Sequence, residues 1–275
     1  MPEYGKDSRL TYSEYLKVPE LLQLQSEQSD PAVHDELQFI IVHQVYELWF
    51  KLILHELDSI AAATATATEA GFRTAARLGR RVVSILEVLV SQIHVLESMR
   101  PVDFLAFRNK LNPASGFQSA QFREVEAVLG LKDPALMKRL ATDATAAAAV
   151  RRFDQPSLPE ILYGALRHLG LAVTLPGAER TEAQARSTLQ ALRGIYEQPD
   201  RHSALYDLCE VLLDIDEQVV LWRRHHVMMV ERQIGAKPGT GVGTTGELDG
   251  IRYLRTTLDK QALPDLWAVR TVLEG

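Results

Sequence analysis

Residues 37–57 read LQFIIVHQVYELWFKLILHEL, and their apolar side chains decide what kind of fold the chain can adopt. At 3.6 residues per turn, apolar residues cover nearly the whole circumference of a helix built from this stretch. A helix that is apolar all round is buried in a core, whereas a surface helix has a polar face. We therefore expect residues 37–57 to form a buried helix around which the other elements pack.

A histidine, His43, lies within this apolar stretch. Phe39 and Glu47 lie one helical turn before and after it, and Tyr46 and Phe50 are also on the same face. The spacing alone favours a structural histidine whose ring is satisfied by a backbone carbonyl. A functional imidazole framed by aromatic rings is the alternative, and it needs support from elsewhere in the chain.

The remaining sequence predicts further helices and no strands. No alternating strand pattern of useful length and no fixed-period repeat occurs, so we expect an all-α fold in one domain covering residues 1–275. The low-complexity tract AAATATATEA predicts a helix end and a loop over 61–70. Apolar periodicity and breakers predict one or two short helices in 10–25, longer helices over about 72–99, 119–129, 134–140, 160–169, 181–196, 205–234 and 251–260, and a short terminal helix after Pro264.

Composition narrows the class of protein. The chain has 275 residues, a formal net charge of −6 and 24% charged residues, so no basic footprint for nucleic acid or an anionic membrane is present. No run of eighteen apolar residues and no secretory signal is apparent. A single cysteine, Cys209, excludes an internal disulfide and fits a reducing compartment. We expect a cytoplasmic protein.

Two adjacent histidines, His225 and His226, lie in the longest predicted helix, within LWRRHHVMMVERQIG. Trp222, Met229 and other apolar residues surround His226 on its face, which suits the proximal side of a haem. A histidine pair at the boundary between core and solvent is the alternative. One residue along a helix changes direction by about 100°, so spacing does not decide which of the two would bind iron.

Other metal chemistries are disfavoured by simple absences in the sequence. A di-iron carboxylate bundle needs Glu-x-x-His on two helices, and no glutamate here has a histidine three residues later. Covalent haem attachment needs Cys-x-x-Cys-His, which a chain with one cysteine cannot supply. Cys209 lies among leucines and valines, so we interpret it as a packed core residue rather than a haem ligand.

Two further segments could bind a small molecule. The Gly/Thr-rich stretch 235–250 formally contains G-x-G-x-x-G, but a helix precedes it, so a ligand-clamping loop is a better interpretation than a dinucleotide site. Arg108 follows Phe104 and Phe107 in DFLAFR. An arginine among rings can bind a carboxylate bidentately, or it can simply cover a helix end at the surface.

Several segments of the chain carry a recognisable pattern: LTYSEYLKVPELLQLQ (10–25), HQVYELWFK (43–51), DFLAFR and ASGFQS (within 103–119), HVMMVERQIGAKPGTG (226–241), YLRTTL (253–258) and LPDLWAVRT (263–271). Taken together, these segments resemble the tryptophan 2,3-dioxygenase family, in the family's order, from about residue 10 to residue 272. The family implies an all-α protein that binds haem b with ferrous iron in its active state. It also implies a reaction of L-tryptophan with O₂ that gives N-formyl-L-kynurenine and is the first step of tryptophan breakdown. The family further implies a homotetramer.

The resemblance implies a role for each matching residue. His226, directly before Val in the run ending VER, matches the proximal haem ligand, and His43 matches the distal histidine. Phe39 and Phe104 match the aromatic wall of the indole pocket. Arg108 matches the arginine that pairs with the substrate carboxylate. On this basis His43 is a hydrogen-bond acceptor from the indole N–H rather than an obligatory base.

Three more parts of the site follow from the same resemblance. Ser115 and Gly116 match the distal-side loop, and Thr240 matches the threonine that contacts the substrate ammonium. Residues 1–25 match an arm that reaches a neighbouring subunit and helps to close its site, through Tyr12, Tyr15 and Leu16.

One departure from the family pattern concerns the Gly/Thr-rich loop. Relatives read GTGGSSG soon followed by Tyr-Leu, whereas here GTGVGTTGELDG separates Thr240 from Tyr253 and Leu254. The loop is therefore longer by about five residues, and Thr245 could replace Thr240 at the ammonium. A changed loop is compatible with an alternative function, a haem-dependent oxygenase of secondary metabolism acting on a modified tryptophan or related indole.

Overall fold

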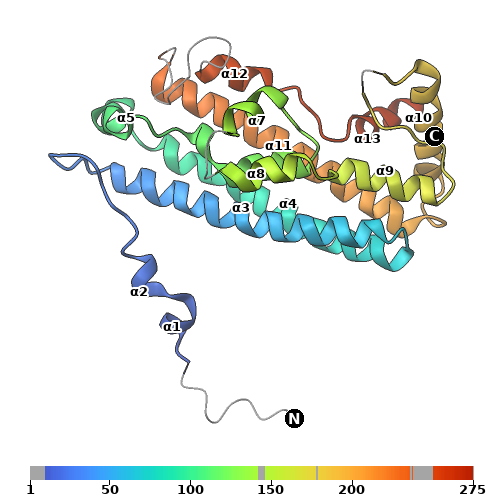
Figure 1. Ribbon diagram of the computed structural model, residues 1–275, viewed down its shortest axis with the longest axis horizontal. Coiled ribbons are helices and arrows are strands. Elements are labelled where there is room, and N and C mark those ends of the chain that lie inside the picture. Colours follow the sequence, from blue (N-terminus) through green and yellow to red (C-terminus); the bar gives the residue numbers. More distant parts are fainter. Residues whose placement is uncertain (1–9, 142–145, 178, 236, 238–249, 275) are drawn as a thin grey trace.

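All elements in the described part of the chain are helices, which confirms the all-α prediction. The computed structural model describes residues 10–141, 146–177, 179–235, 237 and 250–274 (Figure 1). The helices are α1 (Tyr12–Leu16), α2 (Val18–Leu21), α3 (Glu36–Ala65), α4 (Glu69–Glu97), α5 (Pro101–Arg108), η1 (Asn109–Leu111), η2 (Gly116–Gln118), α6 (Ala120–Val128), α7 (Pro134–Leu140), α8 (Ala147–Phe153), α9 (Leu158–His168), α10 (Glu182–Glu197), α11 (Ser203–Ile234), α12 (Gly250–Thr256), α13 (Pro264–Ala268) and η4 (Val269–Val272).

Three long helices, α3, α4 and α11, form the centre of the molecule, and α4 packs against the other two. The contact face of α4 carries buried residues such as Leu89 and Ile93, each 1% exposed. Full burial of one such side chain contributes about 1.5–3 kcal/mol. At Gly79 an added Cβ would lie 2.9 Å from a methyl group of Val211, so glycine lets α4 and α11 approach closely.

The join between α3 and α4 is shorter than the Ala/Thr tract predicted. Helix α3 continues through Ala65, and only residues 66–68 form the turn. Alanine has the highest helix propensity of all residues, so the alanines of the tract extend the helix. The turn ends at Thr68, whose side chain accepts a hydrogen bond from the backbone N–H of Gly71 and caps α4.

The prediction that residues 37–57 are buried all round is wrong on one face of α3. Leu37, Ile41 and Leu48 are 42%, 43% and 55% exposed. The main contacts of α3 are with α4, α6 and α9, and they leave this face exposed in the described part of the chain. By length and composition α3 could also cross a membrane, as could α4 with residues 101–111 if their 90° bend is ignored, but core helices of bundles pass the same test.

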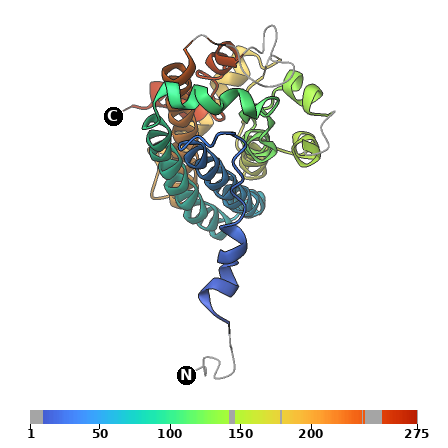
Figure 2. The ribbon, with the colours of Figure 1, turned by 90° about the vertical axis from the view of Figure 1, so that its left-hand side faces the viewer.

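The N-terminal segment lies outside the bundle. Helices α1 and α2 project away from the three long helices (Figures 1 and 2). Tyr12 and Tyr15 are 77% and 73% exposed. The segment is attached to α3 where the side chain of Gln25 donates to Gln44 at 2.6 Å and that of Gln44 donates to the carbonyl of Leu24 at 2.9 Å.

One end of the bundle gathers elements from distant parts of the sequence. Helix α5 lies across this end, beside the first turns of α3 and the last turns of α11 (Figure 2). Helix α12 also contacts α11. The two histidines predicted to be functional therefore lie at the same end, because one is near the start of α3 and the other near the end of α11.

Candidate active site

His43 is held in one orientation by the helix that carries it. Its Nδ1 lies 2.7 Å from the carbonyl oxygen of Phe39, so Nδ1 carries the proton and Nε2 keeps a free lone pair. Burial lowers the pKa of His43, although the Phe39 carbonyl and the carboxylate of Glu47 act to raise it. His43 is therefore a neutral hydrogen-bond acceptor through Nε2.

An aromatic wall stands beside His43. The ring of Phe39 lies 4.0 Å from that of His43, centroid to centroid. Phe104 and Phe107 on α5 both lie 5.6 Å from Phe39 and pack edge to face on each other at 5.4 Å. Helices α3 and α5 thus bring the two predicted wall residues, Phe39 and Phe104, together, and add Phe107, which is fully buried.

Arg108 ends α5 and lies one turn after Phe104, on the same side of the helix. The side chain is partly buried, and burial lowers the pKa of Arg108. An arginine side chain nevertheless keeps its charge in proteins. The arrangement places a cation next to an aromatic wall, which suits an amino acid with an aromatic side chain and a carboxylate.

The structure separates the two histidines that spacing left equivalent. His226 stacks on Trp222 at 5.1 Å with an interplanar angle of 8°, whereas His225 points to α4 and meets His94 edge to face at 5.7 Å. Burial lowers the pKa of His226 to about 4, and the nearby side chains of His43 and Arg123 act in the same direction. In the described part of the chain neither ring nitrogen of His226 has a hydrogen-bond partner, so its neutral ring can donate a lone pair to a metal.

The Ser115–Gly116 segment lies beside α3 as a short 3₁₀ turn. Ser115 begins the turn with a capping box to Gln118. At its other end the hydroxyl of Ser119 donates to Oε1 of Glu47 at 2.6 Å, one helical turn from His43. Sequence reasoning placed Glu47 on the face of His43 but gave it no role, because its partners are more than seventy residues away.

Some predicted site residues are not brought together with His43. Tyr12, Tyr15 and Leu16 lie on the projecting arm, exposed and away from the end of the bundle where His43 lies (Figure 1). Thr240 and Thr245 lie outside the described residues. The arm residues therefore lie apart from His43 in this chain.

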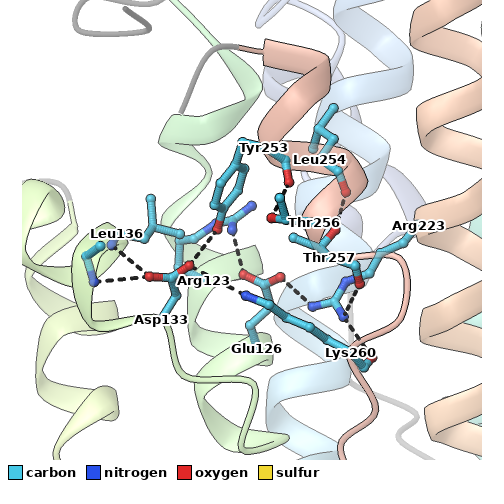
Figure 3. Close-up of polar contacts among 11 residues, drawn as sticks. Arg123, Glu126, Asp133, Leu136, Arg223, Tyr253, Leu254, Thr256, Thr257 and Lys260 are labelled. Carbon is cyan, nitrogen blue, oxygen red and sulfur yellow. Dashed lines mark hydrogen bonds and ion pairs between the residues drawn. The ribbon is translucent and has the colours of Figure 1, made fainter. Parts of the chain in front are cut away.

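Figure 3 shows a buried charged cluster that the sequence analysis missed. Its Arg123 is close enough to His226 to lower the pKa of that histidine. Arg123 and Arg223 both donate to the carboxylate of Glu126, at 2.5 and 2.7 Å. Arg223 also donates to the carbonyls of Thr257 and Lys260, which fixes the end of α12 to α11.

This cluster holds two guanidinium groups and one carboxylate, so it carries an excess of positive charge. Arg123 is 6% exposed and its Nε has no hydrogen-bond partner among the described residues. Buried charges are normally paired, so the cluster suits an additional anionic group. The sequence signal was the spacing of Arg123 and Glu126, three apart in a helix that also carries Phe122, Val125 and Val128.

No group of three or more histidine, cysteine, aspartate or glutamate side chains that could hold a metal ion occurs within the described ranges. Cys209 is fully buried and burial raises the pKa of its thiol to about 12, as expected for a packed core cysteine.

Comparisons with known proteins agree on one family. The family model described as tryptophan 2,3-dioxygenase matches residues 3–155 and 177–273. The chain is 45% identical over 270 residues to the tryptophan 2,3-dioxygenase of a Nocardioides species, covering 97% of this chain and 96% of the relative. The corresponding enzyme of Herpetosiphon aurantiacus is 43% identical over 265 residues, covering 96% and 98%. That of Caulobacter vibrioides is 39% identical over 270 residues, covering 96% and 98%.

Proposed function

The chain belongs to the tryptophan 2,3-dioxygenase family, and we propose on this basis that it cleaves the C2–C3 bond of the indole ring of L-tryptophan with O₂. The product is N-formyl-L-kynurenine, and the reaction begins tryptophan breakdown. The observation that carries the proposal is the grouping of His43, the Phe39–Phe104 wall and Arg108 at the same end of the bundle as His226. The relatives named above act on tryptophan by name, which favours tryptophan over a modified indole.

The residues present fit the haem b that the family implies. His226 would hold the iron, because its imidazole is neutral and no described residue hydrogen-bonds its ring nitrogens. Trp222 stacks on that imidazole and limits its rotation. The excess positive charge at Arg123 suits the propionate carboxylates of a haem. When bound, haem b supplies the ferrous iron that activates O₂, which otherwise reacts slowly with indole.

The chain's own residues would bind and orient the substrate. Arg108 pairs with the carboxylate of tryptophan, and Phe39 and Phe104 enclose its indole ring. Nε2 of His43 accepts a hydrogen bond from the indole N–H, because Nδ1 is already committed to the Phe39 carbonyl. Positioning of this kind can contribute several kcal/mol to catalysis. Contacts at three points define a handed pocket, so the L enantiomer is preferred over the D enantiomer.

His43 acts as an acceptor rather than as an obligatory base. Burial lowers its pKa, which makes the imidazole a weaker base than a histidine in water. The indole N–H is a much weaker acid than imidazolium, so full proton transfer to His43 is unfavourable. Ser115, Gly116 and Thr240 complete the polar end of the pocket in this proposal.

The assembled form is a cytoplasmic homotetramer in our proposal, with the arm of each subunit closing a neighbour's site. Tyr12, Tyr15 and Leu16 are exposed on the arm, and the last is 44% exposed. The exposed apolar residues Leu37 and Ile41 on α3 offer a face for a second subunit close to the base of the arm. A subunit interface would cover both surfaces.

The proposal is tested by turnover. The protein is purified, loaded with haem, reduced and mixed with L-tryptophan in air, and the products are identified by mass. We expect N-formyl-L-kynurenine, with D-tryptophan a much poorer substrate. A protein that retains haem and consumes no O₂ with L-tryptophan, or that returns an indole with its ring intact, contradicts the proposal.

A further inference from the structure

Glu47 connects the helix of His43 to the segment that contains Ser115 and Gly116. Its Oε1 accepts a hydrogen bond from the hydroxyl of Ser119 at 2.6 Å, and its Oε2 accepts one from the side-chain amide of Gln121 at 2.8 Å. The same amide nitrogen lies 2.9 Å from the backbone carbonyl oxygen of Glu47. These contacts hold the start of α6 against the middle of α3.

Ser119 joins two short elements. Its backbone N–H donates to the carbonyl of Gly116 at 3.3 Å and closes the 3₁₀ turn, while its hydroxyl accepts from the N–H of Phe122 at 3.3 Å and caps α6. The turn is also closed internally by the capping box between Ser115 and Gln118. Segment 115–119 is thus a compact unit, and Glu47 is its polar anchor on α3.

A second glutamate on α3 shows what an ordinary structural carboxylate looks like in this protein. Glu56 is 3% exposed and pairs with Arg81 at 2.6 Å. It lies nine residues beyond Glu47 and makes no contact with the segments of the site. Glu47 differs because its side-chain partners are neutral donors from the segment 119–121. Hydrogen bonds to a carboxylate are about twice as strong as neutral ones, so the anchor is firm.

We propose that Glu47 is a positioning residue of the substrate site, which sets the distance between His43 and the Ser115–Gly116 segment. The inference rests on the proposed function, in which both groups contact tryptophan. The inference goes beyond the proposed function because that function gives Glu47 no role, and the partners of Glu47 in the structure are Ser119 and Gln121. Glu47 follows His43 by one turn, so a rigid α3 transmits the position of one group to the other.

The first test separates KM from kcat. We expect Glu47→Ala to raise the KM for L-tryptophan about tenfold, because hydrogen bonds to a charged group are lost. We expect kcat to fall less and the haem content to stay at the wild-type value, because His226 is on α11. Ser119→Ala should raise KM less, and Ser119→Thr, which keeps the hydroxyl, should restore it.

A double-mutant cycle shows whether the two residues act through one contact. Glu47→Ala combined with Ser119→Ala should raise KM no further than Glu47→Ala alone, since either change breaks the same hydrogen bond. Glu56→Ala is the matched control, which should lower the melting temperature and leave KM unchanged. Additive effects of Glu47→Ala and Ser119→Ala, or a Glu47→Ala variant with wild-type KM, overturn the inference.

A measurement independent of turnover separates this inference from the proposed function. In the haem-loaded protein, amide hydrogen exchange at residues 116–122 should be faster in Glu47→Ala than in wild type and unchanged in Glu56→Ala. Unchanged exchange in Glu47→Ala overturns the anchoring contact. If wild-type protein does not turn over tryptophan, the proposed function fails and the substrate role of Glu47 fails with it, whereas faster exchange would still support the anchor.

Discussion

The two histidines of the site, His43 on α3 and His226 on α11, differ in what fixes the orientation of the imidazole ring. The Nδ1–H of His43 donates a hydrogen bond to the carbonyl of Phe39, and Nε2 remains available as an acceptor. His226 is oriented by stacking on Trp222, with no hydrogen-bond partner on either nitrogen among the described residues. Burial lowers the pKa of both. The two neutral imidazoles therefore suit different roles. His43 suits accepting a hydrogen bond from a substrate N–H, and His226 suits binding a metal.

The largest expected effect comes from removing the metal-facing imidazole. We expect His226→Ala to lose bound haem and all turnover, because His226 is the proposed iron ligand and the adjacent His225 packs against His94 instead. His225→Ala is the matched control, since His225 contacts His94 on the other side of the helix, and it should keep haem. The measurement is the haem-to-protein ratio after gel filtration. Full haem content with an unchanged spectrum in His226→Ala would remove it from the iron.

Arg108→Ala sharpens the comparison because Arg108 is the residue proposed to pair with the substrate carboxylate. A bidentate charged contact typically accounts for about 2–5 kcal/mol, so KM for L-tryptophan should rise by at least about thirtyfold with haem retained. Arg100→Ala is a matched control, because Arg100 is exposed and pairs with Asp103 at the start of α5. A KM equal to that of wild type would exclude Arg108 from carboxylate binding.

His43→Ala tests the acceptor role with a smaller expected effect. Loss of one net hydrogen bond costs about 0.5–1.5 kcal/mol, so kcat/KM should fall about tenfold or less while haem is retained. His55→Ala, an exposed histidine of the same helix, should behave as wild type. Complete loss of turnover in His43→Ala would instead indicate an obligatory base.

The smallest effect concerns pH. The pKa of folded His43 lies below its ordinary value of 6.5, so the ring stays a neutral acceptor as the pH falls through 6.5. We expect kcat/KM to stay level across this value, and a decline centred on pH 6.5 would contradict the account. The unfolded chain binds a proton at His43 at a pH where the folded chain does not, so this residue lowers the free energy of unfolding as the pH falls below 6.5. His43→Ala should reduce that dependence.

Apolar periodicity and helix-breaking residues predicted where the helices begin and end more accurately than which of their faces are exposed. The expected helix at 205–234 corresponds to Ser203–Ile234 and that at 181–196 to Glu182–Glu197, because capping residues and prolines mark helix ends locally. The exposed face of α3 was not predicted, because hydrophobicity shows that a face prefers burial but not which chain covers it. An interface in our proposed tetramer would account for the exposed Leu48.

The site shows the same division. The family resemblance predicted that His43, Phe39 and Arg108 belong to one site. Helical spacing alone did not decide which of His225 and His226 would bind iron. Glu47 and Arg123 could not be assigned from the sequence, because their meaning depends on partners in distant segments or on a group that the chain does not itself contain.

The central claim is that a haem-loaded site at this end of the bundle inserts O₂ into tryptophan. The most direct measurement is the mass of the product formed by the reduced, haem-loaded protein from L-tryptophan under isotopically labelled O₂. The account predicts N-formyl-L-kynurenine in which both inserted oxygen atoms carry the label. A product with one labelled atom and an intact indole ring, or no product from protein that retains haem, would contradict it.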